Sequence, residues 1–358
     1  MNADHTDRGQ EILAFLIEKV AHHPGDLVRI TCDKFGITRQ AVNRYLQELI
    51  EAGKIVASGN TNQRRYELPI LRHEVFTLPL AGLEEDVVWR ERIAPFTVQL
   101  SGHVVGLWQY CVSGMVNNAI DHSGGTQLRM RVEQNAAFTQ IIVMDDGIGI
   151  FRKIKDSCGL EDERHAVLEL AKGKLTTDPA RHTGEGIFFT SRMLDDFAIL
   201  SGDVFFSHKH EEDEDWISQR EKPDTGTAVF MILSNTRSRT TQEVFDYFAS
   251  DEHDYGFTKT VVPVRMAQHG VEQLISRSQA KRLLARVDRF AIVLFDFKGV
   301  EAIGPAFADE IFRVFERGHP NIRLVPVNAV PAVERMVNRA RSTSHDSPTK
   351  KQEAQPEG

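Results

Sequence analysis

The chain has 358 residues, of which 41% are hydrophobic and 26% are charged, a composition typical of a globular protein with roughly two or three domains. Its 43 Lys and Arg residues stand against 51 Asp and Glu residues, so the net charge is −8. This charge excludes a uniformly basic protein that coats nucleic acid, but not a small basic module. Three cysteines without paired spacing argue against a disulfide scaffold or a cysteine-based zinc site. We therefore expect a cytoplasmic protein with neither a membrane-spanning helix nor a secretion signal.

The first 70 residues predict three helices and a β-hairpin. Apolar residues at helical spacing indicate two helices within residues 10–35. Thr38 is a good N-cap for a third helix over residues 39–52. Two short extended segments on either side of Gly59-Asn60-Thr61-Asn62 indicate the hairpin. Because this is the element order of a winged helix-turn-helix, we predict that fold for residues 1–70.

The same segment is locally basic. Seven basic residues against three acidic ones give a net charge of +4 over residues 29–65. A recognition helix presents its N-terminal side chains to base edges, and basic residues beside it contact phosphate. We therefore predict DNA binding; the alternative is a module of the same fold that contacts only protein. The predicted DNA-binding residues are Thr38, Arg39, Gln40, Asn43, Arg44, Arg64 and Arg65.

Two motifs in the middle of the chain place polar groups on or after apolar elements. Asn117 and Asn118 interrupt the apolar face of a helix predicted over residues 108–123, and an Asn carbonyl oxygen is a suitable ligand for Mg²⁺. An apolar strand over residues 141–144 leads into Asp145-Asp146-Gly147-Ile148-Gly149. Glycines let a backbone turn pass close to a flat ligand. A carboxylate accepts hydrogen bonds, for example from the exocyclic amine of adenine.

Two further motifs are rich in glycine. Gly184 and Gly186 open a helical pattern, and the N–H groups of a helix N-terminus suit phosphate oxygens. Thr225-Gly226-Thr227 leads into the apolar strand over residues 228–233. Each motif alone is more often an ordinary turn, so the prediction rests on the order and spacing of all four motifs.

Together the four motifs resemble the GHKL ATPase superfamily, the Bergerat fold of gyrase, Hsp90, sensor histidine kinases and anti-sigma-factor kinases. The resemblance covers about residues 100–235 and implies an α/β sandwich that holds ATP and Mg²⁺ between helices and sheet; we place this domain at residues 100–250. It implies that Asn118 ligates Mg²⁺, that Asp145 contacts adenine, and that residues 151–182 form the ATP lid. The residues implied to bind the cofactor are Asn117, Asn118, Asp145, Gly147, Gly149, Lys174, Gly184, Gly186 and Thr227.

Two lysines of the implied lid have two interpretations. Lys172 and Lys174 flank a glycine in the lid segment, and from there they reach the phosphates or belong to a solvated surface. The residues alone do not decide between these interpretations.

One departure from the superfamily concerns catalysis. In its ATPases and serine kinases, a Glu stands four residues before the Mg²⁺ ligand and activates the attacking oxygen, whereas here the residue is Gly114. Three interpretations stay open: ATP is bound but hydrolysed very slowly, Asp121 or Glu185 replaces the base, or the chain is an altered copy of an active enzyme. We expect weak or absent hydrolysis and name no catalytic residue. A histidine kinase is not expected, because residues 71–99, interpreted as a linker, are too short for a dimerising hairpin with a phosphoacceptor His.

The C-terminal segment alternates strand and helix patterns, which predicts a small α/β layer. It resembles the STAS superfamily, specifically a STAS-like branch fused to GHKL domains, and we place this domain at residues 256–341. Residues 276–282, 296–300 and 307–312 carry the resemblance. In anti-sigma-factor antagonists with this fold, a Ser at the start of the helix after the Asp-containing strand is phosphorylated. The corresponding Gly304-Pro305-Ala306 has no hydroxyl.

The sequence thus predicts a multidomain α+β protein: a winged helix-turn-helix, a Bergerat-fold α/β sandwich and a STAS-like α/β domain, with a disordered polar tail over residues 342–358. We expect an ATP-binding, DNA-binding transcriptional regulator whose middle domain senses or uses ATP and Mg²⁺ and couples to the STAS-like domain. One alternative is an ATPase or anti-sigma-type Ser/Thr protein kinase that acts on a partner protein. Another is an interaction scaffold with a degenerate pocket. A protein partner of the STAS-like domain and an oligomeric state are compatible with each.

Overall fold

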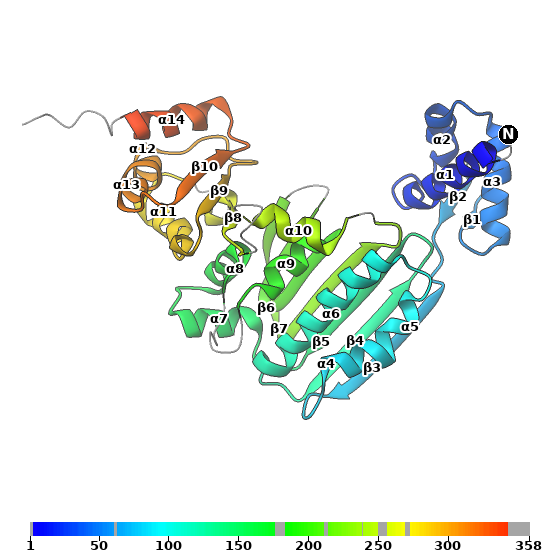
Figure 1. Cartoon of the computed structure of the whole chain (residues 1–358), viewed down its shortest axis with the longest axis horizontal. Helices are drawn as coiled ribbons and strands as arrows, with labels where there is room; N and C mark the ends of the chain where they lie inside the picture. Colours follow the sequence, from blue (N-terminus) through cyan, green and yellow to red (C-terminus); the bar gives the residue numbers. More distant parts are fainter. Residues whose placement is uncertain are drawn as a thin grey trace, which may run out of the picture.

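The computed structural model describes residues 3–60, 63–175, 183–210, 214–237, 239–249, 256–268 and 273–342. The described strands form a two-stranded, a three-stranded and a five-stranded sheet, with helices packed around them (Figure 1). The architecture is therefore mixed α/β. Among the helices that the structure describes, none combines the length and apolarity needed to cross a membrane.

The N-terminal part has the predicted elements and a small core of its own. Three helices are followed by an antiparallel hairpin: α1 (Ala3–Lys19), α2 (Leu27–Phe35), α3 (Arg39–Glu51), β1 (Val56–Ser58) and β2 (Arg65–Glu67). Thr38 caps α3 as predicted, because its hydroxyl accepts a hydrogen bond from the backbone N–H of Ala41 at 3.2 Å. The apolar stripes of the three helices and the inner face of the hairpin close over one cluster that contains Leu16, Val42 and Tyr66.

The middle part is built on an antiparallel sheet in the order β3-β4-β5-β7-β6. The long helix α6 (Gly102–His122) crosses the sheet, with α9 (Gly186–Met193) and α10 (Thr241–Phe248) beside it (Figure 1). Alternate residues of β4 and β5 are buried, so each strand directs one row of apolar side chains into the core. The strands are β3 (Arg72–Pro79), β4 (Gln127–Gln134), β5 (Phe138–Asp145), β6 (Asp196–Lys209) and β7 (Glu214–Ser234).

The prediction of a linker over residues 71–99 is wrong. β3 pairs with β4 along its whole length, from Arg72 opposite Gln134 to Pro79 opposite Gln127. Because Pro79 ends an edge strand, its missing N–H removes no bond from the interior of the sheet. Three short helical segments follow and bury part of their apolar surface in the main core: α4 (Glu85–Val88), the π-helical turn η2 (Trp89–Ile93) and α5 (Ala94–Thr97).

The segment expected to be a lid is largely helical. It contains α7 (Ile150–Cys158) and α8 (Glu163–Lys172), whereas residues 176–182 lie outside the described part. Phe151 and Ala166 are fully buried, and α8 packs on strand β8 (Lys259–Pro263) of the C-terminal part. Up to Leu175 the segment is therefore part of the folded core.

Five acidic residues in a row, Glu211–Asp215, would repel one another in a packed segment, so the sequence predicts a solvated loop there. Its first three residues lie outside the described part, but its last two belong to β7. There Glu214 stands opposite Lys209, and Asp215 stands opposite His208. The loop interpretation is wrong for these two residues, because the β6–β7 ladder extends through them.

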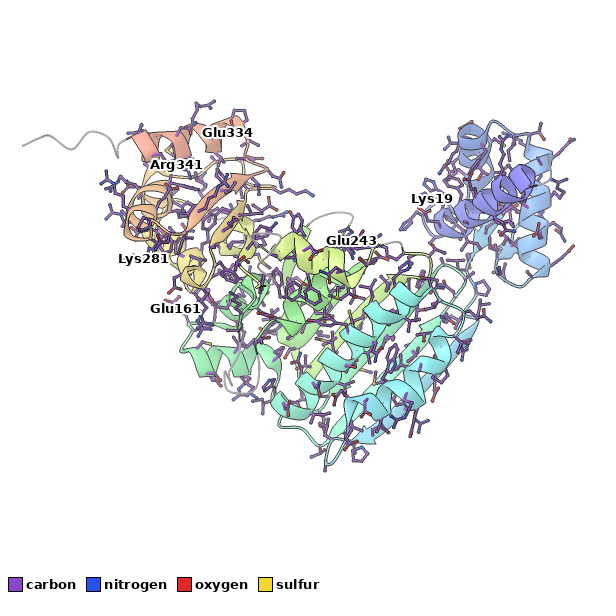
Figure 2. All side chains as sticks on the ribbon, viewed as in Figure 1. Lys19, Glu161, Glu243, Lys281, Glu334 and Arg341 are labelled. Atoms are coloured by element: carbon purple, nitrogen blue, oxygen red, sulfur yellow. The ribbon has the colours of Figure 1, made fainter. Side chains whose placement is uncertain are left out.

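The C-terminal part contains a parallel sheet in the order β10-β9-β8, with β9 (Ile292–Asp296) in the centre and β10 (Arg323–Val327) at one edge. Arg341, which Figure 2 labels on the last helix, ties that helix to the sheet. It donates to Glu316 at 2.8 Å and to the carbonyl of Leu324 at 2.9 Å. The helices are η3 (Val264–Ala267), α11 (Arg277–Leu284), η4 (Val287–Arg289), α12 (Pro305–Asp309), η5 (Glu310–Phe315), α13 (Glu316–Gly318) and α14 (Pro331–Ser342).

The middle and C-terminal parts share one continuous core. A single cluster of buried apolar side chains runs from Leu80 to Ala340, whereas the N-terminal cluster contains none of its members. The proposed boundary near residue 250 therefore separates two sheets but not two hydrophobic cores. Residues of the predicted tail from 343 onward lie outside the described part.

Candidate functional site

A cavity of about 360 Å³ opens between the sheet of the middle part and helices α6, α7 and α9. Segments that are far apart in the sequence meet in its wall, including the end of α6, the end of β5 and the start of α9. Most of the wall is apolar, with Met115, Val143 and Phe188 among its residues. The residues predicted from the motifs that line this cavity are Asn117, Asn118, Asp145, Gly184, Gly186 and Thr227.

Two adjacent carboxylates have different roles at the end of β5. Asp146 is exposed and accepts hydrogen bonds from the backbone N–H groups of Thr126, at 2.6 Å, and Gln127, at 2.9 Å. These bonds, together with the Thr126 hydroxyl, lower the pKa of Asp146 to about 2. Asp145 instead lines the cavity, and burial raises the pKa of its carboxyl. Asp146 thus fastens the turn to β4, whereas Asp145 presents its carboxyl to the cavity.

The turn after Asp145 lies tightly against the end of α6. A Cβ atom added to Gly147 would lie 2.2 Å from the carbonyl oxygen of Ser123, which no side chain tolerates. Gly147 N–H donates to Asp145 Oδ1 at 2.9 Å, and Thr227 Oγ1 accepts from Ile150 N–H at 3.1 Å. Gly147 and Gly149 are not part of the cavity wall. They shape it indirectly, by letting the turn pass between α6 and β7.

The second glycine motif forms another part of the cavity wall. Gly184 has a φ of +74°, and its carbonyl accepts from Leu175 N–H at 3.1 Å. A Cβ at this position would lie 2.4 Å from the backbone of Leu175, so only glycine permits this approach. Helix α9 then begins at Gly186, and Gly186 and Ile187 both line the cavity.

The predicted phosphate ligand Lys174 lies outside the cavity wall. Its ammonium donates to the carbonyl of Arg289 at 3.0 Å and lies 4.9 Å from the centroid of the Phe290 ring. Arg289 returns a hydrogen bond to the carbonyl of Lys174 at 2.8 Å. Lys174 therefore connects the middle part with the C-terminal part.

Lys172 is almost completely buried, with 1% of its surface exposed. Its ammonium donates to Glu169 at 2.7 Å and to the carbonyls of Arg282, at 3.1 Å, and Ala285, at 2.8 Å. Burial lowers the pKa of Lys172, and the nearby charge of Glu169 opposes that shift. The interpretation of Lys172 as a solvated surface residue is therefore wrong. The apolar residues around it in α8 pack against β8 and carry the lysine into the interior.

Lys153 is a wall residue that the motifs did not reveal. It lines the cavity from α7, and its ammonium donates to the carbonyl of His122 at 2.7 Å. Burial lowers its pKa, a shift that the charge of Asp121 opposes. Its position one helical turn after Gly149 was the available signal, since that spacing directs it to the same side as the start of α7.

Gly114 lines the cavity from α6 and leaves space beside it. A Cβ added there would meet only Thr190 Oγ1, at 3.9 Å, which is an ordinary contact distance. Of the two acids considered as substitutes, Asp121 is exposed and Glu185 is partly buried at the start of α9. Burial raises the pKa of Glu185, and neither acid belongs to the cavity wall.

The predicted DNA-contact residues of the N-terminal part are exposed on α3 and the hairpin. In α3, Val42 and Leu46 are buried, and the polar residues between them face outward. The hairpin buries Tyr66 and exposes its neighbours. All seven predicted residues are exposed: Thr38, Arg39, Gln40, Asn43, Arg44, Arg64 and Arg65.

Within the described ranges, no group of three or more His, Cys, Asp or Glu side chains is arranged to hold a metal ion. A cation in the cavity would therefore rest on amide oxygens and on groups that its ligand brings with it. Asn118 and Asn117 provide such oxygens in the wall.

Comparison with known proteins concerns the C-terminal part. A comparison with curated proteins gives no match. Residues 279–334 match the family model described as a STAS-like domain of unknown function (DUF4325). The matched stretch begins in α11, ends in α14 and includes strands β9 and β10. The match confirms the STAS-like prediction for this part of the chain.

Proposed function

We propose that this chain is an ATP-binding regulatory protein whose N-terminal part is a DNA-binding winged helix-turn-helix and whose middle part is a GHKL-type nucleotide domain. The observation that carries the proposal is the cavity of about 360 Å³, because residues of all four sequence motifs line it. Unrelated turns have no physical reason to converge on one cavity. A nucleotide site explains why they do.

The groups in the wall suit ATP and Mg²⁺. Asp145 offers an acceptor at a partly buried position, where the exocyclic amine of adenine would donate. Asn118 would ligate Mg²⁺ through its amide oxygen, with Asn117 beside it. Lys153 and the first N–H groups of α9 would hold phosphate oxygens. The negative charge of the triphosphate would complement these donors.

The cavity also has a physical route to the STAS-like part. Phe188 lines the cavity and packs against Phe257, with ring centroids 4.6 Å apart and the rings tilted by 35°. Phe257 in turn packs against Phe290 at 5.1 Å, and the hydroxyl of Thr260 donates to the carbonyl of Lys172 at 2.6 Å. A ligand shifts an equilibrium only if it binds one arrangement better than another. Through these contacts, ATP would select one arrangement of the STAS-like part.

An ATPase or Ser/Thr protein kinase that acts on a partner protein is the second candidate. The space beside Gly114 is compatible with descent from an active enzyme, because a Cβ atom fits there without displacing its neighbours and the position faces the cavity. The STAS-like part does not supply a phosphoacceptor at residues 304–306. At Gly304 a Cβ atom would lie 2.8 Å from Ile275 Cα, so a serine at that position would require the backbone to move.

The experiment that tests the proposal is a titration of the full chain with ATP, with and without Mg²⁺, followed by DNA binding in each state. We expect saturable ATP binding that Mg²⁺ strengthens. Asp145→Asn replaces an acceptor by an amide that also donates, so it should weaken ATP binding about tenfold or more. Asp156→Asn is the matched control, because Asp156 lies on the exposed side of α7 and outside the wall. Equal ATP affinity in both variants, or no binding by the native chain, would refute the nucleotide site.

A further inference from the structure

The edge strand β3 is long and regular. It stands at the end of the strand order in the five-stranded sheet, and among the described strands it pairs with β4 alone. The pairing continues without interruption from Arg72 to Pro79. A strand at the edge of a sheet presents a row of unpaired backbone N–H and C=O groups, which is a template for another strand. The free side of β3 is therefore suited to strand pairing.

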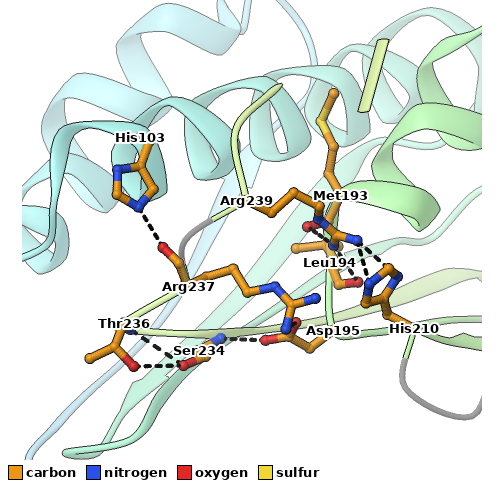
Figure 3. Close-up of polar contacts among 9 residues, drawn as sticks. All are labelled: His103, Met193, Leu194, Asp195, His210, Ser234, Thr236, Arg237 and Arg239. Atoms are coloured by element: carbon orange, nitrogen blue, oxygen red, sulfur yellow. Dashed lines mark hydrogen bonds and ion pairs between the residues drawn. The ribbon is translucent and has the colours of Figure 1, made fainter. Parts of the chain in front are cut away.

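The opposite edge of the same sheet differs from β3. There, α7 and α8 contact β6, and a side chain occupies the backbone just before the first residue of β6. Arg239 donates to the carbonyls of Met193, at 2.7 Å, and Leu194, at 3.3 Å (Figure 3). In the described part of the chain, β4 is the one element with which β3 makes extensive contacts. Of the two edges, β3 is therefore the one that is available to a partner strand.

The backbone groups of β3 alternate in direction. Leu80 N–H donates to the carbonyl of Thr126 at 3.0 Å, in the same register as the β3–β4 ladder. Because hydrogen-bonded pairs recur at every second residue of an antiparallel ladder, the even-numbered residues of β3 bond to β4. The odd-numbered residues direct their N–H and C=O groups to the free edge, namely His73, Val75 and Thr77. The side chains of these three residues are exposed.

A second copy of β3 fits this edge best in one antiparallel register. Centred on Val75, the pair places Val75 opposite its symmetry mate and His73 opposite Thr77, so three N–H groups of each strand meet a carbonyl. A centre one residue earlier would bring Glu74 directly against Glu74 of the second copy, and like charges there are destabilising. A centre one residue later would bring His73 opposite Pro79, which has no N–H to donate.

We propose that β3 pairs with β3 of a second copy of this chain, antiparallel and centred on Val75, so that two five-stranded sheets form one continuous sheet. The interface uses the same surface of both copies, as a two-fold symmetric dimer does. Main-chain hydrogen bonds supply affinity, and each Val75 covers an apolar side chain that is otherwise 42% exposed. The pairing depends on neither ATP binding nor DNA binding.

The pairing would also set the spacing of the two N-terminal parts. In each copy the hairpin strand β2 ends at Glu67, shortly before β3 begins at Arg72. In the proposed register Arg72 stands opposite Leu78 of the second copy, so the two Arg72 residues lie roughly 20 Å apart along the strands. The two N-terminal parts then leave the sheet at opposite ends. If they bind DNA as proposed above, they would recognise two half-sites related by a two-fold axis.

Sedimentation equilibrium of the full chain measures the pairing, and we expect a monomer–dimer equilibrium. Val75→Pro should weaken dimerisation about tenfold or more, because it removes the N–H that each copy donates to the other. The same variant should keep the unfolding midpoint of the larger core, since this N–H points away from β4. A native chain that stays monomeric at all concentrations, or a Val75→Pro variant that dimerises as well as the native chain, would overturn the proposal.

An exchange of charges tests the register. Val75→Lys and Val75→Glu each place like charges opposite one another and should weaken dimerisation about fivefold or more, whereas an equimolar mixture of the two variants should restore it. The matched control Val56→Lys changes a strand valine that is 45% exposed in the N-terminal part and should have no effect.

Ile142→Lys distinguishes edge pairing from face-to-face packing of two sheets. Ile142 lies between the buried Ile141 and Val143 of β5, so its side chain points to the outer face of the sheet, away from the core. Dimerisation should be unchanged in this variant. Loss of the dimer in Ile142→Lys, or no recovery in the mixture of Val75→Lys and Val75→Glu, would contradict pairing at β3.

Discussion

The N-terminal part and the remainder of the chain differ in how their hydrophobic cores are organised. The N-terminal helices and hairpin enclose their own cluster of buried side chains, and no residue of that cluster belongs to the larger core. The middle and STAS-like parts instead share one core, in which Lys172 and Phe257 join elements from both sides. Binding of a ligand in the middle part can therefore act on the STAS-like part through side chains that are packed together. Among the described residues, no cluster of buried apolar side chains joins the N-terminal part to the larger core, and the chain connects the two parts between β2 and β3.

Removal of Lys172 should break the shared core and leave the separate core intact. Lys172→Met would leave the carboxylate of Glu169, which is 4% exposed, without its cation, and two carbonyls without a donor. Loss of one partner of a buried ion pair costs about 3–5 kcal/mol of unfolding free energy. We expect thermal unfolding of the full chain to show a lower midpoint for the larger core and an unchanged midpoint for the N-terminal part.

The control for this variant is Lys54→Met, which alters an exposed lysine of the N-terminal part and should leave both midpoints in place. A shift of both midpoints together in Lys172→Met would show that the two cores unfold as one unit. That result would contradict the separation of the two cores.

The adjacent Asp145 and Asp146 make the stability of the larger core depend on pH in opposite directions. The pKa of Asp146 falls from 3.8 to about 2 in the folded chain, so its carboxylate stabilises the fold above about pH 4. This stability is lost as the pH falls toward 2. Burial raises the pKa of Asp145, so ionisation of that group opposes folding as the pH rises.

Asp146→Asn should therefore lower the unfolding midpoint of the larger core at pH 6 and have almost no effect near pH 2. Thermal denaturation of the native chain and the variant at both pH values measures the difference. Asp156→Asn, on the exposed side of α7, serves as the comparison at each pH. A midpoint difference as large near pH 2 as at pH 6 would contradict a role for the ionised Asp146.

Gly114→Glu tests whether a carboxylate at this position raises ATP hydrolysis. Because the position has room and lies in a helix, the substitution should be tolerated and should remove the helix cost of glycine, about 1 kcal/mol relative to alanine. If the missing carboxylate limits hydrolysis, phosphate release from ATP should rise in the variant. Equal release in both proteins, well above background, would show that another group already acts as the base.

Local signals made most of the fold predictable. Thr38 as an N-cap and the turn at Gly36, with φ of +62°, define the start of α3 from residues that are adjacent in the chain. The apolar run that becomes β9 is likewise recognisable as a buried strand. The edge strand β3 was missed because its partner β4 begins 48 residues after Pro79, and only that pairing distinguishes it from a linker.

The site was predictable to the extent that glycines and carboxylates mark it. Asp145 and Gly184 line the cavity where the motifs implied. The lysines were not predictable, because their positions depend on distant backbone. Lys172 and Lys174 contact carbonyls more than 100 residues away in the chain, whereas Lys153 lines the cavity without belonging to any motif. A short sequence pattern specifies the turn that it forms. It does not specify which distant part of the chain packs against the residues beside that turn.

The smallest effect is expected in the separate N-terminal core. Arg64 is exposed on the hairpin, and its guanidinium lies 5.5 Å from the centroid of the Tyr66 ring. Arg64→Gln should therefore leave both unfolding midpoints unchanged. If it contacts phosphate, DNA affinity should fall by a similar factor on every sequence, and the salt dependence of log affinity should decrease by about 1.

Fluorescence anisotropy with labelled duplexes at several salt concentrations measures this slope, and Arg90→Gln, outside the N-terminal part, provides the control. An unchanged slope in Arg64→Gln would remove the hairpin from the DNA interface. The same titrations with and without ATP measure whether the nucleotide changes the DNA affinity of the N-terminal part. No buried apolar residue is shared between the two cores among the described residues, so an effect of ATP on DNA affinity would show coupling that does not pass through a shared core. Equal affinity in both states would confine the action of the nucleotide to the core that it shares with the STAS-like part.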